Sequence, residues 1–143
     1  MKRALLDVNV LIALLDAAHV HHARAHAWLA TNARAGWASC PLTENGCIRV
    51  MSNAAYPGPL AASSVAARLA EATKTPHHEF WPDDLSLLTP GALRWERLLG
   101  SRQLTDAYLL ALATRRNGRF ATFDTGAPVA AVSGAGPEHL AVL

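Results

Sequence analysis

Four acidic side chains stand where they could act together on one ion or substrate. They are Asp7, Glu44, Asp106 and Asp124. Asp7 and Asp124 each follow a mainly apolar run of the kind that forms a buried strand. Glu44 and Asp106 each follow a threonine and precede an apolar stretch, which is typical of a helix start. Two of the acids are therefore expected just past strand ends, and the other two at helix starts.

These positions are expected to converge at one edge of a sheet. When helical crossovers join parallel strands, the carboxyl ends of the strands and the amino ends of the helices share an edge. Two carboxylates ~4 Å apart repel each other by roughly 4 kcal/mol at an effective dielectric constant near 20. A divalent cation relieves that repulsion, and oxygen ligands suit Mg²⁺, with Mn²⁺ as an alternative. Each acid taken alone is more simply a helix cap or a polar strand end, but the four together favour a metal site.

The elements that must position these acids alternate along the chain. Turn signals and apolar patterns predict strands at residues 3–7, 36–40, 78–81, 120–123 and 139–142. They predict helices at residues 10–15, 19–29, 43–51, 65–72, 89–100 and 105–118, with a loop at 53–62. Thr43 is expected to cap the helix that contains Glu44. This alternation predicts an α/β fold, with three α/β/α layers around a mostly parallel central sheet.

Size and composition fit one domain that spans residues 1–143. The chain is 51% hydrophobic, which is enough to bury a core without disulfides. The formal net charge of +2 is too small to indicate nucleic acid by itself. Only Lys2 and Lys74 are lysines, and the other eleven basic residues are arginines. That bias fits either RNA binding, since arginine is the better bidentate phosphate ligand, or an arginine-rich genome composition.

The sequence predicts a cytoplasmic protein without a membrane segment. Cys40 and Cys47 have no second thiol at metal-ligand spacing, so both are expected to be buried and reduced. Asp7 and Asn9 interrupt the apolar run near the N-terminus, where a secretory signal would be continuous. No other stretch is long and apolar enough to cross a bilayer.

Four short stretches carry the acids in a recognisable order. They are residues 5–12 (LLDVNVLI), 43–44 (TE), 104–113 (LTDAYLLALA) and 121–124 (ATFD), and residues 78–84 (HEFWPDD) accompany them. In order and spacing these stretches resemble the PIN-domain ribonucleases, and within that family the VapC toxins of prokaryotic toxin–antitoxin pairs. The resemblance covers nearly the whole chain.

The resemblance implies a metal-dependent endoribonuclease that inhibits translation by cutting transfer RNA or a ribosomal RNA loop. It implies that the catalytic and metal-binding residues are Asp7, Glu44, Asp106 and Asp124, and that Asn9 and Thr122 support them by hydrogen bonds. In a two-metal site the ions stabilise the attacking and leaving oxygens. Asp7 and Asp106 would hold the first Mg²⁺, and Glu44 and Asp124 would complete the site. A bound water would attack, leaving 5′-phosphate and 3′-hydroxyl ends.

The resemblance also implies two protein partners. One is a VapB-type antitoxin, and the other is a second copy of the chain in a homodimer. The helices predicted at residues 10–15 and 19–29 carry much aliphatic surface for a small domain, and we expect that surface to serve both contacts.

Two other functions stay open at this point. One is a PIN-domain nuclease that processes RNA without an antitoxin, and the other is a non-catalytic metal-binding α/β module. A haloacid-dehalogenase-type phosphatase is excluded, because it needs an aspartate where Asn9 stands and a lysine beyond Lys74.

Several side chains outside the four acids also have two interpretations each. A histidine cluster fits an exposed helix start better than a zinc site; it consists of His19, His21, His22 and His26. Trp95 is expected to pack in a core or interface rather than stack on a base. Four arginines flank the helix of Asp106 and fit either RNA backbone contacts or a solvated face; they are Arg97, Arg102, Arg115 and Arg116.

Overall fold

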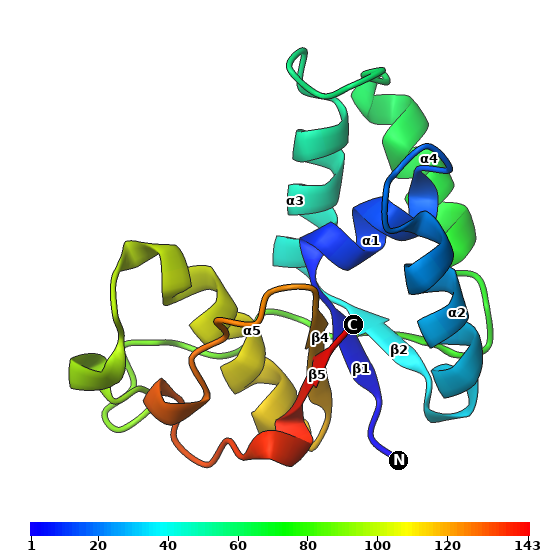
Figure 1. The fold of residues 1–143 in the computed structure, drawn as a ribbon. Coiled ribbons are helices and arrows are strands. Elements are labelled where there is room, and N and C mark those ends of the chain that lie inside the picture. Colours follow the sequence, from blue (N-terminus) through cyan, green and yellow to red (C-terminus); the bar gives the residue numbers. More distant parts are fainter.

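The computed structural model describes all 143 residues, as a five-stranded sheet with helices packed against it (Figure 1). The strands are β1 (Ala4–Leu6), β2 (Trp37–Ser39), β3 (His78–Phe80), β4 (Arg119–Thr122) and β5 (Leu140–Val142). The helices are α1 (Val8–Leu15), α2 (His22–Asn32), α3 (Pro41–Met51), α4 (Ala62–Ala72) and α5 (Leu104–Arg115). Short 3-10 turns make up the remaining helical segments.

Every pair of neighbouring strands is parallel, in the order β3-β2-β1-β4-β5. β1 lies at the centre, where Leu5 pairs with Ala38 on one side and Leu6 pairs with Ala121 on the other. The residues of β1 and β2 are all buried, because helices cover both faces of the sheet. The predicted three-layer α/β/α fold is confirmed, and its sheet is entirely parallel.

Two apolar clusters hold β1 from opposite faces. Leu5 packs with Trp81, Phe120 and the buried side of α5. Leu6 packs on the other face, against residues of α1, α3 and α4. Alternate residues of a strand point to opposite faces, so these two leucines fix the orientation of β1 and of the acid that follows it.

Two helices that carry predicted site residues begin earlier than the sequence suggested. α1 starts at Val8, because the side chain of Asp7 accepts a hydrogen bond from the Val8 N–H and caps the helix. α3 starts at Pro41, a residue favoured at the first helical position. Thr43 is therefore not the cap; it is the third residue of α3, and its hydroxyl accepts a hydrogen bond from the Cys40 N–H at 3.0 Å.

The prediction of a helix at residues 89–100 is wrong. That segment consists of turns and a single 3-10 turn at Trp95–Arg97. Gly91 adopts a left-handed conformation with φ of 80°, which ends any helix opened by Pro90. Leu93 instead forms an isolated antiparallel bridge with Val132, and its side chain is buried in the core. A contact with a distant part of the chain thus replaces the local helical pattern.

The structure confirms what the sequence predicted for the cysteines. Cys40 and Cys47 are both free and buried, and burial raises the pKa of each thiol to about 11. None of the helices is both long enough and apolar enough to pass through a membrane.

Candidate active site

Asp7 is held in place by its neighbours on β1, α1 and β4. It lies one residue beyond the Leu6–Ala121 pair, at the carboxyl end of the central strand. One oxygen, Oδ1, accepts from the Val8 N–H at 2.7 Å, and the other, Oδ2, accepts from the Thr122 hydroxyl at 2.6 Å. Only 8% of Asp7 is exposed, and Thr122 is fully buried. The supporting hydrogen bond that the resemblance implied for Thr122 is therefore present.

Asp124 joins the same hydrogen-bonded arrangement. Its backbone N–H donates to the Thr122 hydroxyl oxygen at 3.1 Å, so that hydroxyl links Asp7 and Asp124. The Asp124 Oδ1 accepts from the Gly126 N–H at 2.7 Å, which fixes the turn after β4. The side chain of Asp124 is exposed, whereas Asp7 is buried beside it.

Asp106, in the first turn of α5, completes a group of three neighbouring aspartates. The pKa of Asp106 rises to about 7, mainly through burial, and also through the charge of Asp7, a hydrogen bond with Asp124 and the charge of Asp124. Burial also raises the pKa of Asp7; the hydrogen bonds from Thr122 and Val8 oppose that rise, and the charge of Asp124 adds to it. We call Asp7, Asp106 and Asp124 the aspartate group.

Glu44 is held by a different set of contacts. Its Oε2 accepts from the Ser39 hydroxyl at 2.6 Å, and the Ser39 Oγ lies 2.8 Å from Nε2 of His78. Burial lowers the pKa of His78, and Glu44 and the Thr73 backbone oppose that shift. We call Ser39, Glu44 and His78 the Glu44 group.

Strand alternation explains the separation of the two groups. Because Leu5 pairs with Ala38, the next residue of β2, Ser39, stands beside Leu6 and shares its face, on the side of α3 and α4. Asp7 follows Leu6 by one residue, so its side chain leaves the sheet toward α5, where Asp106 lies. The four acids thus share one sheet edge, where Glu44 is held from the side of α3 and α4, and Asp7 from the side of α5.

The aspartate group has the donor chemistry for a hard divalent cation but not a finished ligand shell. No set of three or more Asp, Glu, His or Cys side chains is arranged around one point as metal ligands. The donors available are carboxylate oxygens, which suit Mg²⁺ or Mn²⁺, and Mg²⁺ usually keeps several waters beside one or two carboxylates. Oδ1 of Asn9, two residues after Asp7, is buried without a hydrogen-bond partner. These residues fit the ion chemically, and the assignment of ligands stays a prediction.

The histidine cluster has structural partners. His22 Nδ1 lies 2.7 Å from the carbonyl oxygen of Ala13, and His26 Nε2 lies 3.0 Å from that of Leu14. These carbonyls belong to the last turn of α1, where backbone acceptors lack helical partners. The two histidines therefore secure the end of α1.

The four arginines near α5 differ in their contacts. Arg115 donates to the Asp84 backbone oxygen, and Arg116 forms an ion pair with the Asp84 carboxylate at 3.0 Å. Both stand nine or more residues after Asp106, which is roughly 14 Å along a helix at 1.5 Å per residue. Arg97 and Arg102 are exposed and make no side-chain hydrogen bond or ion pair, which leaves them available to a phosphate.

Trp95 does not pack in the core of this chain, and its predicted interface role stays a prediction. Trp95 is 51% exposed and belongs to neither apolar cluster.

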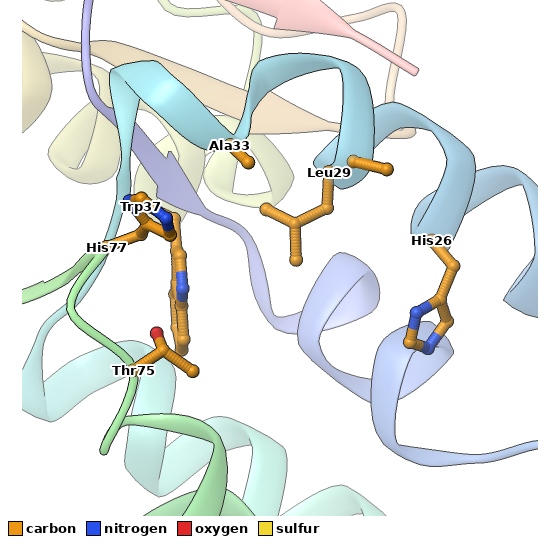
Figure 2. Close-up of a pocket in the computed structure, with 7 residues that line it drawn as sticks. His26, Leu29, Ala33, Trp37, Thr75 and His77 are labelled. Atoms are coloured by element: carbon orange, nitrogen blue, oxygen red, sulfur yellow. The ribbon is translucent and has the colours of Figure 1, made fainter.

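An apolar cavity of about 290 Å³ lies away from the acids, between α2 and the starts of β2 and β3 (Figure 2). Its walls contain no carboxylate; they are His26, Leu29, Ala30, Ala33, Trp37, Thr75 and His77. The acids on which the predicted chemistry depends therefore lie outside this cavity.

Ser39 and His78, which contact Glu44 directly or through one another, were not predicted from the sequence. Ser39 is a small polar residue at a strand end, and His78 lies 39 positions away on another strand. The one available signal was the position of Ser39, at the end of β2 and five residues before Glu44.

Known proteins similar to this chain agree with the fold. The PIN domain family matches residues 4–132. Ribonuclease VapC44 of Mycobacterium tuberculosis is 50% identical over 141 residues, which are 99% of each chain. Ribonuclease VapC39 of the same organism is 42% identical over 132 residues, 92% of this chain and 95% of that one.

A solved structure supports the fold independently. The crystal structure of Mycobacterium tuberculosis VapC20, described as a sarcin-ricin loop cleaving toxin, has a TM-score of 0.61 over 94% of this chain and 99% of that chain. At 14% identity this likeness concerns the fold alone. Because the family matches most of the chain and its relatives align over their full length, the chain belongs to the PIN-domain family and, within it, to the VapC ribonucleases.

Proposed function

We propose that this chain is a metal-dependent endoribonuclease and the toxin of a toxin–antitoxin pair, built as a single PIN domain over residues 1–143. The observation that carries the proposal is the aspartate group. Three carboxylates meet at the carboxyl edge of the sheet, and burial together with their mutual repulsion raises the pKa of Asp106 to about 7. This chain is similar to VapC ribonucleases over nearly its whole length. In such a protein, a group of carboxylates is the expected binding place for a divalent cation and an RNA phosphodiester.

Each acid has a distinct role in this mechanism. Asp7 offers a carboxylate whose orientation is fixed by the Val8 N–H and the Thr122 hydroxyl. Burial and the neighbouring Asp7 and Asp124 raise the pKa of Asp106 to about 7, so loss of its proton near neutral pH adds a second carboxylate for the ion. Glu44 offers its second oxygen, Oε1, which accepts no hydrogen bond from the protein. When bound, Mg²⁺ or Mn²⁺ would make a water more acidic and neutralise phosphate charge; Asp7 and Asp106 would hold the first ion, and Glu44 and Asp124 would complete the site.

The proposed substrate is RNA, either transfer RNA or a ribosomal RNA loop. Cleavage by a water nucleophile would leave 5′-phosphate and 3′-hydroxyl ends and would inhibit translation. Arg97 and Arg102, which are free of internal partners, are the candidates for backbone phosphates.

The proposed partners are a VapB-type antitoxin and a second copy of the chain, in the cytoplasm. The sequence predicted the aliphatic surfaces of α1 and α2 as contacts for both. Most aliphatic residues of α1 are buried within this chain, so the candidate contacts narrow to the partly exposed Leu14, Leu15 and Leu29. Light scattering at tens of micromolar would show a dimer of the purified chain; a monomer, with or without the partner encoded by the neighbouring gene, would contradict this part of the proposal.

A two-part experiment tests the function. In the first, the purified chain is incubated with total RNA in EDTA, Mg²⁺ or Mn²⁺, and cleavage is expected only with metal. In the second, expression of the wild-type chain alone should arrest bacterial growth, and Asp106→Asn at equal protein levels should not. Equal growth of both strains would favour an RNA-processing nuclease without an antitoxin, and metal binding without cleavage would favour the non-catalytic module.

A further inference from the structure

A chain of two hydrogen bonds joins three elements at the sheet edge and ends on Glu44. It runs from His78 of β3, through Ser39 of β2, to Glu44 in the first turn of α3. The two distances, 2.8 Å and 2.6 Å, are those of well-formed hydrogen bonds. None of the bonds in this chain is made to the backbone, so the connection exists only through these side chains.

The direction of the hydrogen bonds follows from proton counting. The Ser39 hydroxyl has one proton, and an ionised Glu44 can only accept. The hydroxyl therefore donates to Glu44 Oε2, and its oxygen must accept from an Nε2–H of His78. This arrangement requires His78 in its Nε2–H form and orients the lone pairs of one Glu44 oxygen toward Ser39. The other oxygen, Oε1, remains free for an ion or its water.

Burial and aromatic packing restrict the motion of these side chains. Ser39 is fully buried, so water does not compete for its hydroxyl. The His78 ring packs against the indole of Trp37 with centroids 4.4 Å apart. Only 6% of Trp37 is exposed, and its side chain forms one wall of the cavity in Figure 2. The His78 ring is thus held on one side by Trp37 and at its tip by Ser39.

We infer that Ser39 and His78 are positioning residues that hold the Glu44 carboxylate for the metal-bearing site. A flexible glutamate at a helix start would sample several rotamers, and the site would bind its ion only in some of them. Fixing Oε2 on Ser39 removes that freedom and leaves Oε1 in one place. Aspartates have shorter side chains, and those of the aspartate group are held by other contacts; Glu44 is the acid that needs such support. The inference rests on the proposed function, because it gives Glu44 a role in that same site.

The test compares metal affinity in the purified protein, measured by calorimetry with Mn²⁺, with kcat and KM for RNA cleavage. Loss of a partner that orients a metal ligand typically costs about 10- to 100-fold in affinity or activity. Ser39→Ala and His78→Phe are each expected to weaken Mn²⁺ binding and lower kcat within that range. KM for RNA should stay near the wild-type value, because neither residue is placed to touch RNA. His78→Gln, whose amide N–H can replace Nε2–H, should recover most of the loss.

Matched controls come from residues adjacent to the same elements. Ser52 lies one residue after the end of α3, and Ser52→Ala removes a hydroxyl that donates to the Ile48 carbonyl. His77→Gln replaces the exposed histidine beside His78. Both should match wild type in Mn²⁺ affinity and kcat. Far-UV circular dichroism and the melting temperature in EDTA will identify any variant that has lost its fold.

Two further measurements separate positioning from general stability. The double variant Ser39→Ala/Glu44→Gln should be no worse than Glu44→Gln alone, because Ser39 acts through Glu44. Long-range ¹H–¹⁵N NMR of the imidazole in the metal-free protein should show the Nε2–H form of His78, and Ser39→Ala should relax that preference.

The outcomes distinguish this inference from the proposed function. If wild type cleaves RNA with metal but Ser39→Ala and His78→Phe keep wild-type kcat and Mn²⁺ affinity, the inference is overturned and the function stands. Additive losses in the double variant would also overturn it. If wild type binds no Mn²⁺ and cleaves no RNA, the proposed function fails, and the inference fails with it.

Discussion

The aspartate group and the Glu44 group lie at the same edge of the sheet, yet they are held in opposite ways. In the aspartate group, three carboxylates lie near one another, and the Thr122 hydroxyl donates to that of Asp7 while it accepts from the backbone N–H of Asp124. In the Glu44 group, one carboxylate is satisfied by a hydroxyl that is in turn supported by a histidine. The first arrangement stores repulsion that a cation can release, and the second stores none. Acids at equivalent topological positions can therefore have different roles. The aspartate group attracts a cation by its accumulated charge, and the Glu44 group offers one carboxylate oxygen in a fixed orientation.

The largest expected effect is on catalysis. Asp7→Asn or Asp106→Asn should lower kcat by roughly a thousandfold or more, because each removes a charge on which several kcal/mol of metal-assisted stabilisation depends. Glu44→Gln should cost less, about 10- to 100-fold. Single-turnover cleavage of a defined RNA, with metal-free reactions as blanks, measures all three variants. If Glu44→Gln lowered kcat as much as Asp106→Asn, the aspartate group and the Glu44 group would not differ in their importance for catalysis.

The next effect is on thermal stability with and without metal. Mg²⁺ or Mn²⁺ that binds only the folded chain at a hundredfold excess over its dissociation constant should add about 2.7 kcal/mol. At pH 8 in EDTA, Asp106→Asn should melt at a higher temperature than wild type, since it relieves repulsion by Asp7 and Asp124. It should also respond less to metal. An aspartate that served only as a helix cap would behave differently, since its loss would lower stability by ~0.5–2 kcal/mol.

Glu44→Gln is the comparison for that experiment. It should not be stabilised in EDTA, because Glu44 faces Ser39 and not another carboxylate. If Asp106→Asn is less stable than wild type in EDTA and neither protein responds to metal, the three aspartates do not share an ion.

The pH dependence of the metal-free protein gives a smaller effect with a definite sign. The pKa of Asp106 is about 7 in the folded protein, and an unfolded aspartate titrates near ~3.9. Between these values the folded state binds more protons, so the free energy of unfolding should fall as pH rises from 4 to 7. Asp7, whose pKa is also raised, adds to the same slope.

Chemical denaturation in EDTA across this pH range measures that slope. Asp106→Asn should flatten it, and Glu71→Gln, which removes an exposed carboxylate paired with Lys74, should leave it unchanged. A slope that is the same in wild type and Asp106→Asn would show that Asp106 titrates as it does in the unfolded chain.

The contrast between the groups also shows what the sequence could and could not predict. Asp7 and Asp124 were predictable, because mainly apolar runs reveal where a buried parallel strand ends. The convergence of Asp106 with them followed from topology alone. The direction of Glu44 did not, because it depends on which face of β2 Ser39 occupies and on a histidine 39 residues away from Ser39.

The same reason explains the wrong helix at residues 89–100. The pattern around Leu93 is locally helical, but its backbone pairs with Val132, and no local signal reports a partner that far along the chain. The boundaries of α1 and α3 were missed by smaller margins. There a capping aspartate and a proline competed with the apolar period that the prediction followed.

The smallest expected effect compares the two hydroxyls that serve these groups. Thr122→Val removes the hydroxyl that donates to buried Asp7. The loss of this hydrogen bond should lower the free energy of unfolding by about 1–3 kcal/mol in EDTA at pH 8. Ser39→Ala removes the donor to half-buried Glu44, which can turn to water, so its cost should lie near ~1 kcal/mol. The two hydroxyls share no partner, so the double variant should show the sum of the single effects to within ~0.5 kcal/mol. Urea unfolding of wild type, both single variants and the double variant, with Thr122→Ser as the variant that keeps its hydroxyl, measures the coupling. A coupling energy well above that margin would mean that the aspartate group and the Glu44 group form one hydrogen-bonded unit, and that the ion and its glutamate are positioned together.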